Sequence, residues 1–162
     1  MLHHVLHAYK MNLEFAKNLV KDLSTEQMCQ QPNGVVNHPA WSLGHLAVSE
    51  GHLCQFLGVS SPVPDDWDKT FRTGGIPSAE VEAFPSQDEL LEVLGKLHEK
   101  VGKAMSETNQ EILDQPHPNE GTRKYFPTIG DYAVFLMTSH GRSHLGQLSA
   151  WRRAMGLGPP VK

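Results

Sequence analysis

TIGDYAVFLMTSHGRSHLGQLSAWRRAM, residues 128–155, is the segment that decides the fold. Its apolar residues recur every three or four positions, which is typical of a helix with one face in the core. Thr128 and Asp131 predict a capping box at its start, and Gly156 predicts its end. Two histidines interrupt the inward stripe, which contains Ala133, Met137, His140, His144, Leu148, Trp151 and Met155.

Three more helices are predicted from the same kind of pattern, at about residues 3–23, 37–57 and 86–105. Asn37 is the expected cap of the second helix, and Ser86 with Glu89 forms a capping box for the third. Residues 59–85 contain PDDWDKTFRTGG and connect the second helix to the third. A connection this long lets those two helices run parallel. No alternating strand pattern is present, so the predicted fold class is an all-α four-helix bundle.

Composition limits the classes of function. The 162 residues suit a single domain over residues 1–162, with 39% hydrophobic and 20% charged residues. A net charge of −4 offers no electrostatic footprint for nucleic acid. We expect no membrane partner, because no run approaches the roughly 18 apolar residues of a spanning helix. The first residues, MLHHVLHAYK, do not resemble a secretion signal, and Cys29 and Cys54 are too few for a disulfide framework, so a cytoplasmic location is expected.

Ten histidines are the unusual feature of the composition. His140 and His144 are four residues apart, so their side chains lie one above the other on a helix and can share a metal ion. The same spacing occurs at His3 and His7, and two buried imidazoles can instead hydrogen-bond to each other or to backbone. On the second helix, the inward stripe contains His45 and His52, which lie about 10.5 Å apart along the axis. Only one of them can therefore reach the same ion.

The chain lacks HExxH, Glu-x-x-His pairs and CxxC, which argues against metalloprotease, di-iron and zinc-finger sites. Three histidines with open water positions describe a reactive metal centre, because structural zinc sites are normally closed by four protein ligands. Spacing alone does not decide between His45 and His52 as the third ligand.

Several segments together resemble the DinB-like (YfiT-like) metalloenzyme superfamily over essentially the full chain. They are NHPAWSLGHL (37–46), DDWDKTFRTGG (65–75), FPSQDELLEVL (84–94) and SHGRSHLGQLSAWRRAMGLGPP (139–160). The resemblance implies a bundle of up-down-down-up topology, a metal held by His45, His140 and His144, and a homodimer. Characterised members of the superfamily include transferases and isomerases that use low-molecular-weight thiols such as bacillithiol or mycothiol.

The leading hypothesis is therefore an enzyme that binds a divalent ion, Zn, Ni or Fe by ligand softness, and acts on a small molecule or thiol. Gln147, His52 and Trp67 are candidates for contacts to the substrate or to the metal ligands. The sequence indicates no general base. The alternative is a non-catalytic metal-binding or stress-related bundle module.

Overall fold

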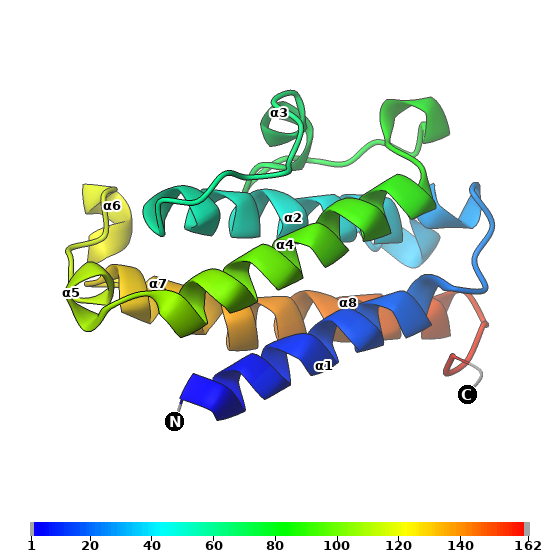
Figure 1. The fold of residues 1–162 in the computed structure, drawn as a ribbon. Coiled ribbons are helices and arrows are strands. Elements are labelled where there is room, and N and C mark those ends of the chain that lie inside the picture. The colour runs from blue at the N-terminus through cyan, green and yellow to red at the C-terminus, as the bar shows by residue number, and fades with distance from the viewer. Residues whose placement is uncertain (1, 161–162) are drawn as a thin grey trace.

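Four long helices form the body of the protein (Figure 1). The structure is a computed structural model and describes residues 2–160. The helices are α1 (Leu2–Val20), α2 (Pro39–Phe56), α4 (Gln87–Glu107) and a last helix that comprises α7 (Ile129–Phe135), η4 (Leu136–His140) and α8 (Gly141–Ala154). The chain runs one way through α1 and the last helix and the opposite way through α2 and α4. The prediction of an all-α bundle is confirmed, and residues 2–160 contain no strand.

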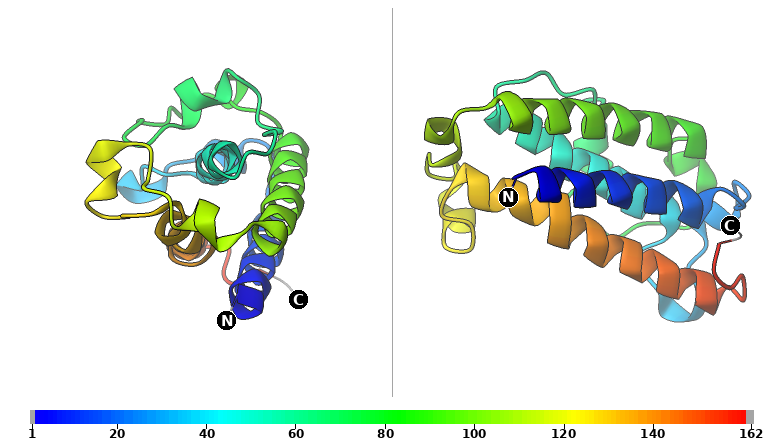
Figure 2. Two further views of the ribbon diagram at one scale, coloured as in Figure 1. Left: turned by 60° about the vertical axis from the view of Figure 1, so that its left-hand side comes forward. Right: turned by 60° about the horizontal axis from the view of Figure 1, so that its bottom comes forward.

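Helix α2 lies at the centre of the arrangement, as the end-on view shows (Figure 2). It contacts α4, α8 and α3 (Trp67–Phe71), and nearly all of its residues are buried. A helix that is buried on all sides carries no amphipathic stripe. The prediction that Asn37 caps this helix is wrong. His38 occupies the cap position, and its Nδ1 accepts a hydrogen bond from the backbone N–H of Trp41 at 3.2 Å.

The other predicted helix ends are mostly confirmed. Ser86 Oγ accepts from the backbone N–H of Glu89 at 3.2 Å, which is one half of the predicted capping box. Both halves of the second box, between Thr128 and Asp131, are present. Gly156 follows the last helix with φ +73°, a conformation that favours glycine.

Short elements connect the long helices. They are η1 (Gln27–Cys29), η2 (Pro32–Gly34), α3, η3 (Val81–Ala83), α5 (Gln110–Leu113) and α6 (Glu120–Arg123). In the long connection, α3 packs on α2 and buries Phe71 completely. The segment between the two parallel helices is thus an ordered cover for the central helix.

The last helix differs from the uninterrupted helix that the sequence predicts. Residues Leu136–His140 form a π segment, which widens the helix and rotates the residues that follow it. The carbonyl of Met137 accepts a hydrogen bond from the side chain of buried Asn12 on α1, at 3.2 Å. Beyond the π segment the buried residues are Gly141, Leu145, Leu148, Trp151 and Arg152. Leu148 and Trp151 of the predicted stripe are thus confirmed, whereas His144 and Met155 are only half-buried.

Within residues 2–160, no helix is long and apolar enough to cross a membrane. Both cysteines are free and buried. Burial raises the pKa of the Cys54 thiol to about 11, so this group stays protonated at neutral pH.

Candidate metal centre

Three histidines from two helices converge on one point. His45 comes from α2, His140 is the last residue of the π segment, and His144 follows one turn later in α8. One ligand atom from each lies within 4.8 Å of the others, and in the described part of the chain this is the only such group of His, Cys, Asp or Glu side chains. The Nε2 atoms of His45 and His140 are 3.2 Å apart. Two nitrogen ligands of a tetrahedral zinc ion, bonded at about 2.0–2.1 Å, lie at about this separation.

The orientation of His45 is set by the long connection. Its Nδ1–H donates to the backbone carbonyl of Phe71 at 2.7 Å. A carbonyl only accepts, so the proton is on Nδ1 and the lone pair is on Nε2, which faces the other histidines. The Trp41 ring stacks on the His45 ring at 4.8 Å with an angle of 5° between the planes, which limits rotation of the imidazole.

Gly44 allows α3 to approach this closely. A Cβ atom at residue 44 would overlap the aromatic ring of Phe71. Phe71 also provides the carbonyl that orients His45. Gly44 therefore makes room for the residue that holds the neighbouring histidine in place. The sequence contains Gly44 next to His45, but a glycine in a helix does not reveal which segment packs against it.

The protonation states of the three imidazoles suit a metal ion. Burial, together with repulsion from His144 and His45, lowers the pKa of His140 to about 3. Burial and the nearby His45 likewise lower the pKa of His144 to about 4. Burial also lowers the pKa of His45. All three rings are therefore neutral at pH 7 and have lone pairs available for a metal.

One further observation favours a ligand at this point. The Nδ1 atom of His144 is buried and has no hydrogen-bond partner among residues 2–160. Buried polar atoms without a partner are costly and uncommon. The donor set, three neutral nitrogens, fits Zn²⁺ and other divalent ions that prefer imidazole.

The histidines form part of the wall of a cavity of about 480 Å³. Its other lining residues are Trp41, Ser49, Thr73, Gly74, Thr122, Tyr125, Phe126, Tyr132, Phe135 and Leu136. The indole Nε1 of Trp41 is buried without an acceptor in the part of the chain that is described. A small molecule in this cavity would reach the three imidazole nitrogens directly.

The other three predicted site residues lie outside the cavity lining. Gln147 is exposed, and its Oε1 accepts from Asn37 Nδ2 at 3.3 Å. The Nε2 of His52 is 3.2 Å from a carboxylate oxygen of Asp68, on the side of α2 that α3 covers. The Trp67 side chain is buried and its ring contacts the Phe71 ring at 5.3 Å.

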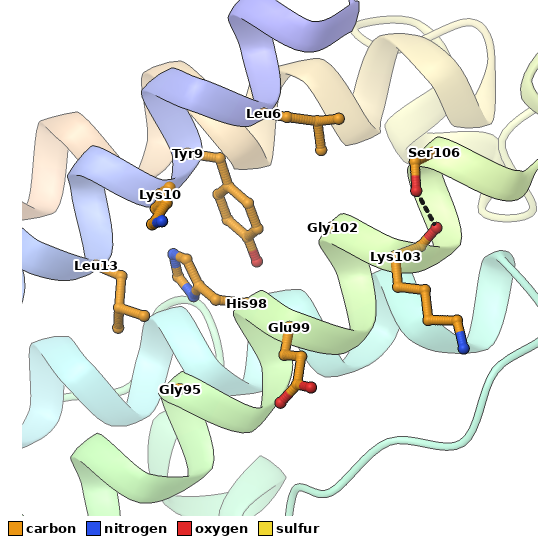
Figure 3. Close-up of a pocket in the computed structure, with 10 residues that line it drawn as sticks. All are labelled: Leu6, Tyr9, Lys10, Leu13, Gly95, His98, Glu99, Gly102, Lys103 and Ser106. Carbon is orange, nitrogen blue, oxygen red and sulfur yellow. Dashed lines mark hydrogen bonds between the residues drawn. The ribbon is translucent and has the colours of Figure 1, made fainter.

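Sequence reasoning missed a second buried polar cluster, on α1, α2 and α4. The carboxylate of Glu50 accepts from the Tyr9 hydroxyl at 2.6 Å, and His98 Nδ1 lies 3.2 Å from the same oxygen. The Tyr9 and His98 rings are stacked at 3.8 Å and line a separate cavity of about 540 Å³ between α1 and α4 (Figure 3). Burial, with the nearby Glu50 charge, raises the pKa of Tyr9 well above its usual value, so its hydroxyl remains a donor. These residues are far apart in sequence and share no motif.

The chain was compared with known protein families. The sequence model of the DinB superfamily matches residues 9–148, which include all three histidines of the candidate centre. The chain belongs to the DinB superfamily. No curated protein matches it.

Proposed function

We propose that the protein is a metal-dependent enzyme in which His45, His140 and His144 hold one divalent ion, Zn, Ni or Fe. The observation that supports it best is the convergence of three neutral imidazoles in the wall of a cavity large enough for a small molecule. Three protein ligands leave positions on the ion for water or substrate. Bound there, the ion would act as a Lewis acid and lower the pKa of a coordinated water or thiol.

The chain's own residues would hold and orient the reactants. Phe71 and Trp41 fix the ring of His45, so that the ligand set is formed before a substrate enters. The lining includes hydroxyl groups of Ser49, Thr73 and Thr122 that can donate to a substrate or accept from it. No Asp or Glu of the described chain lines the cavity, so a general base does not come from a carboxylate in its wall.

For the reaction, we propose that a low-molecular-weight thiol attacks an electrophilic substrate, in either an S-transfer or an isomerisation. This proposal rests on analogy with other members of the superfamily. The chain's own thiols do not serve this role. Cys54 is fully buried, and burial holds its pKa at about 11. A reactive sulfur would therefore enter with the substrate. Metal-loaded protein is tested with a panel of thiols and with electrophiles such as haloarenes and epoxides, and turnover with at least one thiol is expected.

Metal analysis of protein purified without a histidine tag tests the metal centre itself. We expect near-stoichiometric metal in native or reconstituted protein, and His140→Ala is expected to lower the affinity at least 100-fold. His3→Ala is the matched control, since His3 is exposed on α1 and has the same i, i+4 spacing to a second histidine. Equal effects of the two substitutions contradict the assignment. Absence of bound metal favours the non-catalytic module.

A further inference from the structure

The walls of the cavity beside the three histidines are rich in aromatic rings. Trp41 contributes one from α2, and the others come from residues 125–135. Phe126 is central to this second group: its ring lies 4.5 Å from the Phe135 ring and 5.5 Å from the Tyr132 ring. Tyr125 is 69% exposed and belongs to the outer part of the lining. Clustered rings of this kind pack well against flat apolar molecules.

The same walls contain no fixed charge. Among the lining residues of the described chain there is no Lys, Arg, Asp or Glu. Burial raises the pKa of Tyr132, so its phenol remains neutral. A ligand that brought a carboxylate or phosphate into contact with these walls would find no cation except the metal ion. At the inner wall, beside the buried Trp41 ring, such a group would lose part of its hydration without gaining a partner, which is unfavourable.

We infer that the part of the substrate which contacts these walls is neutral, flat and mostly apolar, as in an aromatic thiol, and that thiols which bring a carboxylate against the walls are disfavoured. The inference rests on the proposed metal centre, because the thiol sulfur would be held by the ion while the ring packs against the aromatic walls. The volume, about 480 Å³, lies in the range of small-molecule sites. The unpartnered indole N–H of Trp41 offers one hydrogen bond to a weak acceptor on such a molecule.

Cobalt-loaded protein provides a test that does not depend on turnover, because the visible absorption of Co²⁺ changes when a thiolate binds. Three probes are titrated at equal thiolate concentration: 4-methylbenzenethiol, 4-mercaptophenylacetate and butane-1-thiol. We expect 4-methylbenzenethiol to bind at least tenfold more tightly than the other two, a difference of about 1.4 kcal/mol. Equal affinity of the methyl and carboxylate probes overturns the inference, while the cobalt spectrum still supports the metal centre. If Co²⁺ does not bind at all, the proposed function fails and this inference fails with it.

Two variants separate the contributions of shape and charge. Phe126→Leu removes a central ring and is expected to lower affinity for 4-methylbenzenethiol at least threefold with unchanged Co²⁺ affinity. Phe15→Leu is the matched control, because Phe15 is partly buried on α1 and does not line the cavity. Thr122→Lys adds a cation to the lining and is expected to raise affinity for 4-mercaptophenylacetate relative to the methyl probe. If Phe126→Leu and Phe15→Leu behave alike and Thr122→Lys has no effect, the cavity walls do not select the substrate.

Discussion

Replacing Gly44 with alanine tests how the fold prepares the candidate metal centre. The new Cβ would overlap the ring of Phe71, so α3 must move away from α2. Overpacking of this kind costs about 1–3 kcal/mol of stability. Movement of α3 also withdraws the carbonyl that accepts from His45 Nδ1 at 2.7 Å. Loss of such an outer-shell partner lowers metal affinity by about 10–100-fold, which corresponds to about 1.4–2.7 kcal/mol.

The assay is a competition titration of Zn²⁺ between the protein and a chromophoric chelator, with urea unfolding of the metal-free protein in parallel. Gly146→Ala on α8 is the control, because among the described residues its Cβ would meet no atom within 4 Å. We expect the control to keep its metal affinity and to gain about 0.5–1 kcal/mol of stability from helix propensity. Adding Phe71→Leu to Gly44→Ala relieves the overlap and is expected to restore part of the affinity. Wild-type zinc affinity in folded Gly44→Ala protein would refute the reasoning.

Three further outcomes follow from buried groups. The pKa values of His140 and His144, about 3 and about 4, lie below the value of about 6.5 expected in the unfolded chain, so the unfolded state takes up protons first on acidification. The urea midpoint of metal-free protein should therefore fall from pH 7.5 to pH 5, and less so in His140→Gln; an unchanged midpoint contradicts the assigned burial. Arg152→Met removes a buried guanidinium that pairs with both carboxylate oxygens of Asp22 at 2.6 and 2.8 Å. The free energy of unfolding measured in urea should fall by about 2–3 kcal/mol. A decrease below about 0.5 kcal/mol would show that the pair does not stabilise the fold. Tyr9→Phe takes a hydroxyl donor from a buried carboxylate and should cost about 1–3 kcal/mol by the same assay; a neutral result would mean that another donor replaces it.

The helices and most of their ends could be predicted from the sequence, because periodicity and capping are local. Thr128 and Asp131 form a complete capping box, and Gly156 ends the last helix as expected. The π segment could not be predicted in this way. Within it, the carbonyl of Met137 accepts a hydrogen bond from the side chain of Asn12, 125 residues away in sequence, a contact that no local pattern reveals.

Prediction of the candidate site was more limited. The spacing of His140 and His144 indicated a shared ligand position, but the choice of His45 over His52 came from the resemblance to a family. In the structure the α3 segment explains the difference physically. It supplies a backbone carbonyl to His45 and a carboxylate, from Asp68, to His52. Backbone carbonyls leave no mark in a sequence pattern, so this support is visible only in three dimensions.

Buried charges could not be placed from the sequence either. Arg152 lies near the end of the last helix, where a basic residue is favourable on the surface, yet its side chain is 1% exposed and bonds to α1. Likewise, nothing local to Glu50 indicates that its carboxylate meets Tyr9 and His98 inside the bundle. Such pairs depend on how distant helices align.

A crystal structure of zinc-saturated protein, with anomalous scattering used to locate the metal, tests the central claim most directly. We predict one zinc ion per chain, bonded at about 2.0–2.1 Å to a nitrogen of each of His45, His140 and His144. An ion bound at His3 and His7 instead, or no ion at the three converging imidazoles, would contradict the account.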